Sequence, residues 1–205
     1  MTDLLTDLGK IAGVLAFLGY IPYILSILKR KTVPNPATWW IWGIMGAVAL
    51  ASYYAAGNRE AIWVQNSYVI GPNVTAVLSI KFGRNEFSQF DKYCLGAAGL
   101  SIILWQVFGS PLVALTISIA IDFLAIAPTL RKTYFKPDTE DPLSWSVFWI
   151  ANTLNLYVVL VSEAPSYASL AYPIDLFLLP TSIMCLIIRG RWFMKNQPNL
   201  GSLEE

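Results

Sequence analysis

Two carboxylates lie inside stretches of the sequence that otherwise carry almost no charge. Asp122 lies in the middle of one apolar run, and Asp175 lies in the last such run. A carboxylate in hydrocarbon costs about 3 kcal/mol or more unless it faces a cavity, pairs or carries a proton. No Lys or Arg stands at the same depth, which favours a cavity or a proton. We therefore predict both at a polar cavity, with Asp122 binding a solute or exchanging a proton; the alternative is a hydrogen bond to a neighbouring helix.

Four neutral side chains at similar depth complete the predicted binding site: Asn73, Asn152, Thr181 and Trp149. An amide offers two donors and an acceptor, which suits the hydroxyl groups of a sugar or the edge of a nucleoside. An indole ring inside a cavity could stack on a solute. The structural alternative is that the amides bond to neighbouring helices and that Trp149 packs against them.

The residue types that are missing exclude several kinds of chemistry. Histidine is absent, which removes His-based acid–base catalysis, Ser-His-Asp systems and nearly every common zinc site. Cys94 and Cys185 stand alone in apolar runs, so we interpret them as buried thiols. A net charge of +1 gives no support for a nucleic-acid partner. The sequence predicts no enzyme, no cofactor and no metal.

The composition indicates a membrane protein. Of the 205 residues, 56% are hydrophobic and 13% are charged, whereas a soluble domain has about 25% charged residues. A membrane-spanning helix needs about 20 mostly apolar residues. Seven segments meet or approach that length within one membrane domain, 1–205: about 11–28, 37–56, 61–80, 93–108, 111–130, 143–162 and 168–188.

The basic residues predict the orientation of these spans. If seven helices alternate sides, twelve Lys and Arg residues fall on one side, and only Lys10 and Arg59 fall on the other. Basic residues favour the cytoplasmic side. The N-terminus is therefore predicted outside and the C-terminus in the cytoplasm, most simply in the plasma membrane or the bacterial inner membrane.

The sequence repeats itself at an offset of 106 residues. Residues 20–40, YIPYILSILKRKTVPNPATWW, align without a gap on the segment that starts at 126, so that Pro22 matches Pro128, Pro36 matches Pro142 and Trp39 matches Trp145. Two three-helix units are predicted, at about 1–81 and 111–189, with a linker helix at about 92–108 and a tail at 190–205. Three spans followed by one more make the two units parallel.

Prolines inside the predicted helices recur at matched places. Pro22 and Pro128 form one pair, and Pro72 and Pro180 form another. Proline removes a helix hydrogen bond and kinks the chain, so these four are predicted hinges or gates. The alternative is that prolines are simply frequent in membrane helices.

Seven of the eight tryptophans lie near predicted span ends, where an aromatic belt at the membrane surface is expected. Trp149 alone lies well inside a span. The seven are Trp39, Trp40, Trp42, Trp63, Trp105, Trp145 and Trp192.

The order of these features resembles the SWEET and PQ-loop superfamily of membrane transporters. The likeness rests on the plan of three, one and three helices, on Pro128-Thr129, on Lys31-Thr32 and on Pro72-Asn73. Tyr23 and Thr129 stand where the family's PQ dipeptide has glutamine. The resemblance implies an all-α fold of two parallel three-helix bundles joined by a linker helix. It also implies a substrate site that includes Asn73, with Thr181 at the partner position.

The expected function is alternating-access transport of a small polar solute such as a sugar, an amino acid or a vitamin, either as a uniporter or coupled to protons. The alternative is a binding, receptor or assembly protein that uses the same cavity without transport. The KDEL receptors resemble the same plan but use basic residues in the cavity, and the predicted spans have none. The sequence is compatible with a homo-oligomer as well as with a monomer.

Overall fold

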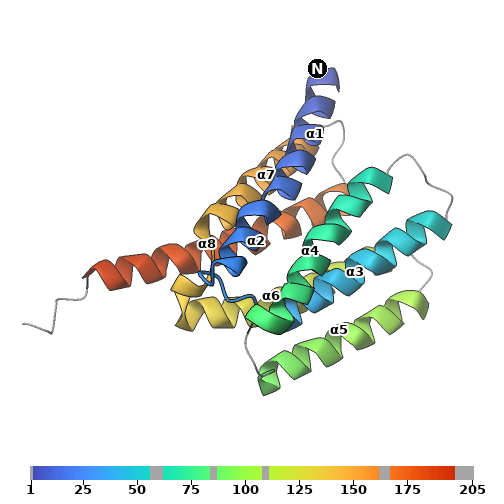
Figure 1. Ribbon diagram of the computed structural model, residues 1–205. Helices are drawn as coiled ribbons and strands as arrows, with labels where there is room; N and C mark the ends of the chain where they lie inside the picture. The colour runs from blue at the N-terminus through green and yellow to red at the C-terminus, as the bar shows by residue number, and fades with distance from the viewer. Residues whose placement is uncertain (1, 56–61, 84–86, 108–110, 162–166, 197–205) are drawn as a thin grey trace, which may run out of the picture.

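The protein is all-helical. The computed structural model describes residues 2–55, 62–83, 87–107, 111–161 and 167–196. Within those ranges the chain forms eight α-helices and one short 3-10 helix (Figure 1). They are α1 Thr2–Leu18, α2 Tyr20–Leu28, α3 Pro36–Ala55, α4 Ile62–Phe82, α5 Gln89–Val107, α6 Pro111–Phe135, η1 Pro137–Thr139, α7 Pro142–Val161 and α8 Tyr167–Asn196. Helices α1 and α2 are separated only at Gly19, so the described residues make seven helical rods.

Three of these rods are long and apolar enough to cross a membrane. They cover Asp7–Leu28, Pro142–Val161 and Leu170–Phe193, and Val69–Phe82 is a shorter apolar helix. Seven helices were predicted and are present, whereas only three of the seven predicted spans meet the requirements for length and hydropathy within the described residues. The seventh helix also runs past its predicted end at 188, because α8 continues to Asn196 through much of the expected tail.

Proline explains where several helices begin and bend. Pro36 and Pro142 occupy the first positions of α3 and α7, where the missing N–H costs nothing. Pro22 is the third residue of α2. Its ring opposes the carbonyl four residues earlier, that of Leu18, and α1 ends at that residue. Pro22 therefore lies just after a break at Gly19, within the rod that covers Asp7–Leu28.

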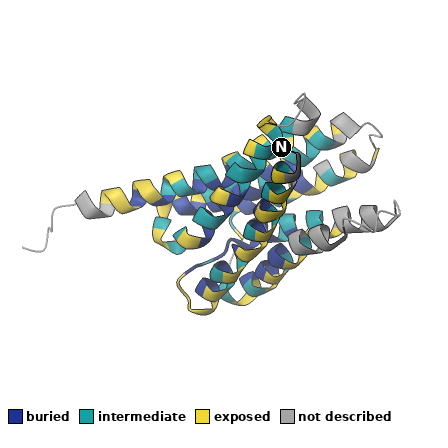
Figure 2. Ribbon diagram, turned by 90° about the horizontal axis from the view of Figure 1, so that it is seen from above, coloured by how far each residue is buried: buried dark blue, intermediate teal, exposed yellow. Residues whose placement is uncertain are grey.

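The core lies where helices from the two halves of the sequence meet. Helix α3 packs on α4 and α6, while α7 packs on α8 and α1, as Figure 1 shows for the α1–α7 pair. Buried residues follow the inner faces of the helices (Figure 2). Trp39 and Trp145 are 1% and 3% exposed. The prediction that these two belong to an aromatic belt is wrong, because their rings pack around Tyr23 at centroid distances of 4.9 and 6.2 Å.

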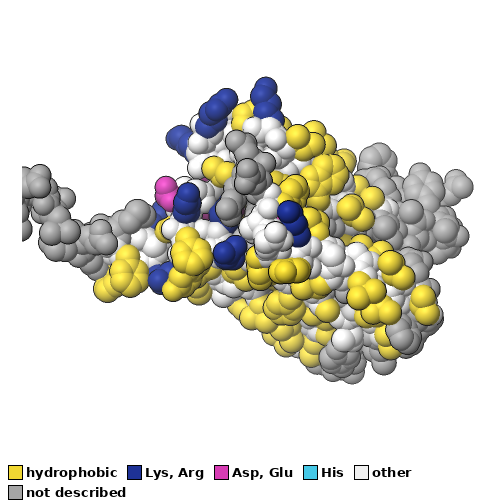
Figure 3. All heavy atoms as spheres, turned by 90° about the horizontal axis from the view of Figure 1, so that it is seen from below, with side chains coloured by type: hydrophobic (Ala, Val, Ile, Leu, Met, Phe, Trp, Pro, Cys, Tyr) yellow, Lys and Arg dark blue, Asp and Glu magenta, His cyan; other side chains and the backbone are white. Residues whose placement is uncertain are grey.

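The outer surface is largely apolar except at one end. Exposed hydrophobic side chains include Ile80, Tyr93 and Val107, as expected of helices that face lipid. Cys94 is buried as predicted, but Cys185 is exposed, which corrects its interpretation as a buried thiol. Basic side chains gather over one part of the face in Figure 3. We call this region the basic end and define it by the exposed residues Lys29, Arg30, Lys31, Lys81, Arg131, Lys136 and Arg189.

Candidate functional site

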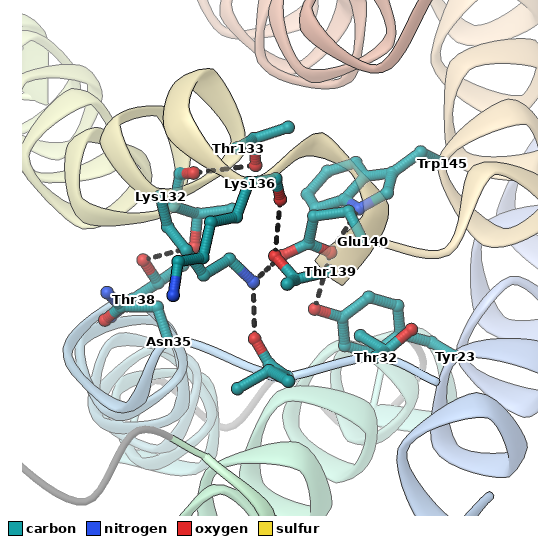
Figure 4. Close-up of polar contacts among 12 residues, drawn as sticks. Tyr23, Thr32, Asn35, Thr38, Lys132, Thr133, Lys136, Thr139, Glu140 and Trp145 are labelled. Atoms are coloured by element: carbon teal, nitrogen blue, oxygen red, sulfur yellow. Dashed lines mark hydrogen bonds and ion pairs between the residues drawn. The ribbon is translucent and has the colours of Figure 1, made fainter. Parts of the chain in front are cut away.

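A buried polar network closes the basic end of the helix bundle (Figure 4). Its centre is Glu140, which lies in extended backbone between η1 and α7. One carboxylate oxygen pairs with the ammonium group of Lys132. The other accepts hydrogen bonds from the Tyr23 hydroxyl at 2.9 Å and from the Trp145 indole N–H at 2.8 Å. Glu140 therefore joins α2, α6 and α7 at one point.

The network keeps a charged pair out of water without leaving it unsatisfied. The side chains of Lys132 and Glu140 are 3% and 0% exposed. Burying an ion pair is unfavourable unless further hydrogen bonds complete both groups. Glu140 has three donors, and Lys132 also donates to the backbone carbonyl of Val33. This cation thus ties the loop after α2 to the loop after α6, and a 3.0 Å bond from the Val33 N–H to the Thr139 carbonyl joins the same loops.

A second link crosses between the halves of the sequence nearby. The Thr129 hydroxyl donates a 2.8 Å hydrogen bond to the Thr38 hydroxyl, and both residues are fully buried. Thr129 lies on α6 and Thr38 in the first turn of α3. On the other side of this turn, the Asn35 amide donates at 3.3 Å to Asp91 at the start of α5. Hydrogen bonds between side chains therefore link α3 to α6 and the residue before α3 to α5 at the basic end, in addition to apolar packing.

The first turns of α3 and α7 are capped in the same way. The Asn35 side-chain oxygen accepts from the backbone N–H groups of Ala37 and Thr38. The Asp141 carboxylate accepts from the backbone N–H and the hydroxyl of Ser144. Asn and Asp are preferred caps because they satisfy otherwise unpaired N–H groups of the first turn. Since Asp141 takes the capping role, the preceding Glu140 is left to face the interior.

The two predicted acidic residues come together inside the bundle. Asp122 on α6 and Asp175 on α8 are 9% and 2% exposed, and their carboxyl groups are close enough to interact electrostatically. The Trp42 indole N–H on α3 donates to Asp122 at 2.9 Å. Among the described residues, neither oxygen of Asp175 has a hydrogen-bond donor. The two side chains therefore form a buried acidic pair between α6 and α8, with one hydrogen-bond donor, Trp42, among the described residues.

The neutral residues of the predicted site bond mainly to their own helices. The Asn73 amide donates to the carbonyls of Val69 at 2.8 Å and of Gly43 at 3.0 Å. Asn152 and Thr181 each donate to the carbonyl four residues earlier in the same helix. Trp149 is 39% exposed and lies near the ring of Phe177. These contacts are the structural alternative to binding, and a shared cavity with Asp122 stays a prediction for these four residues.

The four predicted hinge prolines all lie inside helices. Pro72 lies in α4, Pro128 in α6 and Pro180 in α8, while Pro22 lies in the first turn of α2, just after the break that follows α1. The structure gives one conformation, so their role as hinges stays a prediction. Among the described residues, no three His, Cys, Asp or Glu side chains lie together in a group that could hold a metal ion.

Sequence reasoning missed the closing network. Lys132 counted only as one of the basic residues that set the orientation, and Tyr23 only as a departure from the PQ dipeptide. The available signal was Glu140 itself, an acidic residue beside the capping Asp141 in a loop that closely follows Arg131 and Lys132. Only one of the two adjacent acids is needed to cap α7. The other, if buried, requires a positively charged partner.

Comparison of the chain with models of protein families, with curated proteins and with solved structures gives no match. Function therefore has to be argued from the geometry of this chain.

Proposed function

We propose that this protein is an alternating-access membrane transporter for a small polar solute, built from two parallel three-helix units around α5. Under this proposal α1–α2, α3 and α4 form one unit, and α6, α7 and α8 form the other. The order of motifs that resembles the SWEET and PQ-loop superfamily supports this division. We place the protein in the plasma membrane or the bacterial inner membrane, with the basic end in the cytoplasm.

Helix packing supports the two-unit arrangement. The third helix of each unit packs on the first and the second, since α4 contacts α1, α2 and α3, and α8 contacts α6 and α7. Between the units, α1 packs on α7 and α6 packs on α3. Each unit therefore sets its first helix against the second helix of the other. The like caps of α3 and α7 fit the same relation.

The observation that carries the proposal is the pair of cross-links at the basic end. Tyr23 and Thr129 are matched positions of the repeat, and each donates to the other unit: Tyr23 to Glu140 and Thr129 to Thr38. Contacts of this kind hold two units together at one end and can break when the units rock apart. The structure then corresponds to a state closed on the cytoplasmic side, which is one of the two states that alternating access requires.

The carboxyl pair gives this carrier its interior polar group. Asp122 and Asp175 lie on the first and third helices of the second unit, and Trp42 reaches Asp122 from the first unit. A change in how the units pack would alter this contact and the solvation of the pair. The pair can hydrogen-bond a sugar, an amino acid or a vitamin, and it can exchange a proton that drives uptake.

Uptake into liposomes tests the proposal. The purified chain is reconstituted and offered a panel of labelled sugars, amino acids and vitamins, with and without an imposed pH gradient. We expect saturable uptake of at least one class and faster exchange when the same solute is present inside. Solute binding without any flux would instead favour the alternative, a receptor or assembly protein with the same cavity.

A further inference from the structure

Two cavities meet at Arg131, and the proposed transport cycle uses neither of them. The smaller cavity, of about 230 Å³, lies at the basic end and is lined by Val33, Arg131, Lys132, Phe135, Lys136 and Thr139. The larger one, of about 520 Å³, is an open groove between α6 and α8 that is lined by Leu130, Arg131, Tyr134, Ser182, Cys185 and Leu186. A single side chain thus belongs to a basic cavity and to an apolar groove.

The smaller cavity is suited to an anion. Arg131 and Lys136 are both exposed, and the positive charge of Lys132 is already balanced by Glu140. Of the acidic residues close by in the sequence, Glu140 is paired with Lys132, and Asp138 and Asp141 line neither cavity. The volume is below the range of about 300–1,000 Å³ that drug-sized ligands occupy, which favours a compact group such as a phosphate. Arg and Lys are the side chains that bind phosphate most readily.

Arg131 is partly held in place for this role. Its guanidinium donates to the Ser88 hydroxyl at 3.4 Å and lies 5.6 Å from the ring centroid of Phe90. Both partners belong to the start of α5 or the residue before it. A guanidinium has five N–H donors, so one weak bond to Ser88 leaves donors for a phosphate. Lys136 and Thr139 lie beside the buried Lys132 in Figure 4.

The groove is suited to a hydrocarbon chain. Its walls are mostly side chains of Leu, Tyr and Cys from α6 and α8, and Cys185 is exposed within it. Arg131 lies one turn before the end of α6 at Phe135, which is where a lipid headgroup would meet the hydrocarbon layer. Basic pockets between membrane helices on the cytoplasmic side commonly bind anionic headgroups.

We propose that these two cavities form one site for an anionic phospholipid, with its phosphate between Arg131 and Lys136 and an acyl chain along the α6–α8 groove. The charge of the smaller cavity selects the headgroup, and the apolar groove selects a lipid over a free phosphate. The site requires the membrane setting but not transport.

Native mass spectrometry of the full chain in detergent tests the site. Phosphatidylglycerol, which is anionic, is titrated against phosphatidylcholine with the same acyl chains. We expect wild type to retain phosphatidylglycerol preferentially. The double variant Arg131→Gln/Lys136→Gln should bind it roughly thirtyfold more weakly, because two basic contacts are lost. The double variant Lys31→Gln/Arg191→Gln removes the same charge from residues that line neither cavity, and it should bind like wild type.

Two outcomes would overturn the proposal. Equal weakening in both double variants would mean that general positive charge, and not this cavity, attracts the lipid. The variant Cys185→Trp fills the groove without removing any basic residue and should also weaken lipid binding. If Cys185→Trp binds lipid normally while inorganic phosphate raises the melting temperature of wild type as much as lipid does, the ligand is a free phosphate.

Discussion

The hydroxyl group of Tyr23 donates a 2.9 Å hydrogen bond to the carboxylate of Glu140, which lies 117 positions further along the chain. Both side chains are buried. Tyr23 comes from the first proposed unit and Glu140 from the second. This bond therefore reports whether the two units are in contact at the basic end.

We expect the double variant Tyr23→Phe/Thr129→Val to open the basic end more often. Each substitution removes one hydrogen bond between the units, worth about 1 kcal/mol or somewhat more for the bond to a carboxylate. A combined loss of about 2 kcal/mol changes the ratio of closed to open states by about thirtyfold. A reporter cysteine at Thr133, which is fully buried, measures opening by its rate of thiol labelling in a background of Cys94→Ser and Cys185→Ser.

The matched control for this experiment is Tyr157→Phe/Thr153→Val. Tyr157 is exposed and Thr153 is half-buried on α7, and the Thr153 hydroxyl bonds only within its own helix in the contacts that are described. Labelling at position 133 should stay at the wild-type rate in the control. Equal acceleration in both double variants would show that labelling follows general loosening of the protein and not separation of the units.

The ion pair at the same end should matter for stability. Glu140→Gln leaves the buried Lys132 ammonium without its counter-charge, and removal of one partner from a buried pair costs about 3–5 kcal/mol. Replacing both residues, as Lys132→Met/Glu140→Gln, removes the uncompensated charge and should cost less than the sum of the single changes. Thermal unfolding in detergent of Glu140→Gln, Lys132→Met and the double variant completes a double-mutant cycle with wild type.

An exposed ion pair provides the comparison. Lys10 and Asp7 are 3.0 Å apart, with side chains 70% and 65% exposed. Such pairs contribute less than about 1 kcal/mol, so Asp7→Asn should change the unfolding temperature little. If Glu140→Gln is as mild as Asp7→Asn, the network does not hold the loops together.

Glycine substitutions test how tightly the loop after α2 packs on the end of α4. A Cβ atom at Gly83 would lie 2.3 Å from the Ser79 carbonyl oxygen and 2.9 Å from the Pro34 carbonyl oxygen. Backbone oxygens cannot rotate away as side chains can, so Gly83→Ala should destabilise the protein by about 1–3 kcal/mol. At Gly96 on α5 a Cβ atom would meet nothing within 4 Å, and Gly96→Ala should be neutral or stabilise by up to about 1 kcal/mol. Unfolding midpoints compare the two, and an equal effect would contradict the close packing at Gly83.

The helices could be predicted from the sequence because local signals determine them. Pro36 and Pro142 start α3 and α7 as expected, and the apolar runs give the seven rods. For Asp122 and Asp175, the sequence predicted only that each acid needs a polar surrounding or a partner at membrane depth, and not that their carboxyl groups interact with each other. In the structure Trp42 donates to Asp122, and Asp175 lies near Asp122 without a hydrogen-bond donor among the described residues.

Contacts between distant segments could not be predicted in this way. Trp39 and Trp145 lie at the membrane-surface positions that an aromatic belt favours, yet packing around Tyr23 buries both. Lys132 lies among exposed basic residues and has no local signal that separates it from Arg131. Its burial depends on Glu140 being turned inward, because Asp141 caps α7. Such outcomes follow from tertiary contacts and not from local sequence.

The carboxyl pair leads to the last prediction, which concerns the driving force. If the pair exchanges a proton during transport, Asp122→Asn mimics the protonated acid and cannot release it. The variant should retain solute exchange but lose acceleration by a pH gradient. A gradient of one pH unit is worth about 1.4 kcal/mol per proton, which limits the accumulation it drives to about tenfold.

Asp175→Asn should have a similar effect because the two carboxyl groups act as one pair, whereas Asp138→Asn on the exposed η1 turn should behave like wild type. Uptake into proteoliposomes with an imposed gradient measures all three. A gradient response of Asp122→Asn equal to that of wild type would exclude the pair as the coupling element. If wild type itself shows no response, the protein is a facilitator, and the pair serves to hydrogen-bond the solute or to hold α6 against α8.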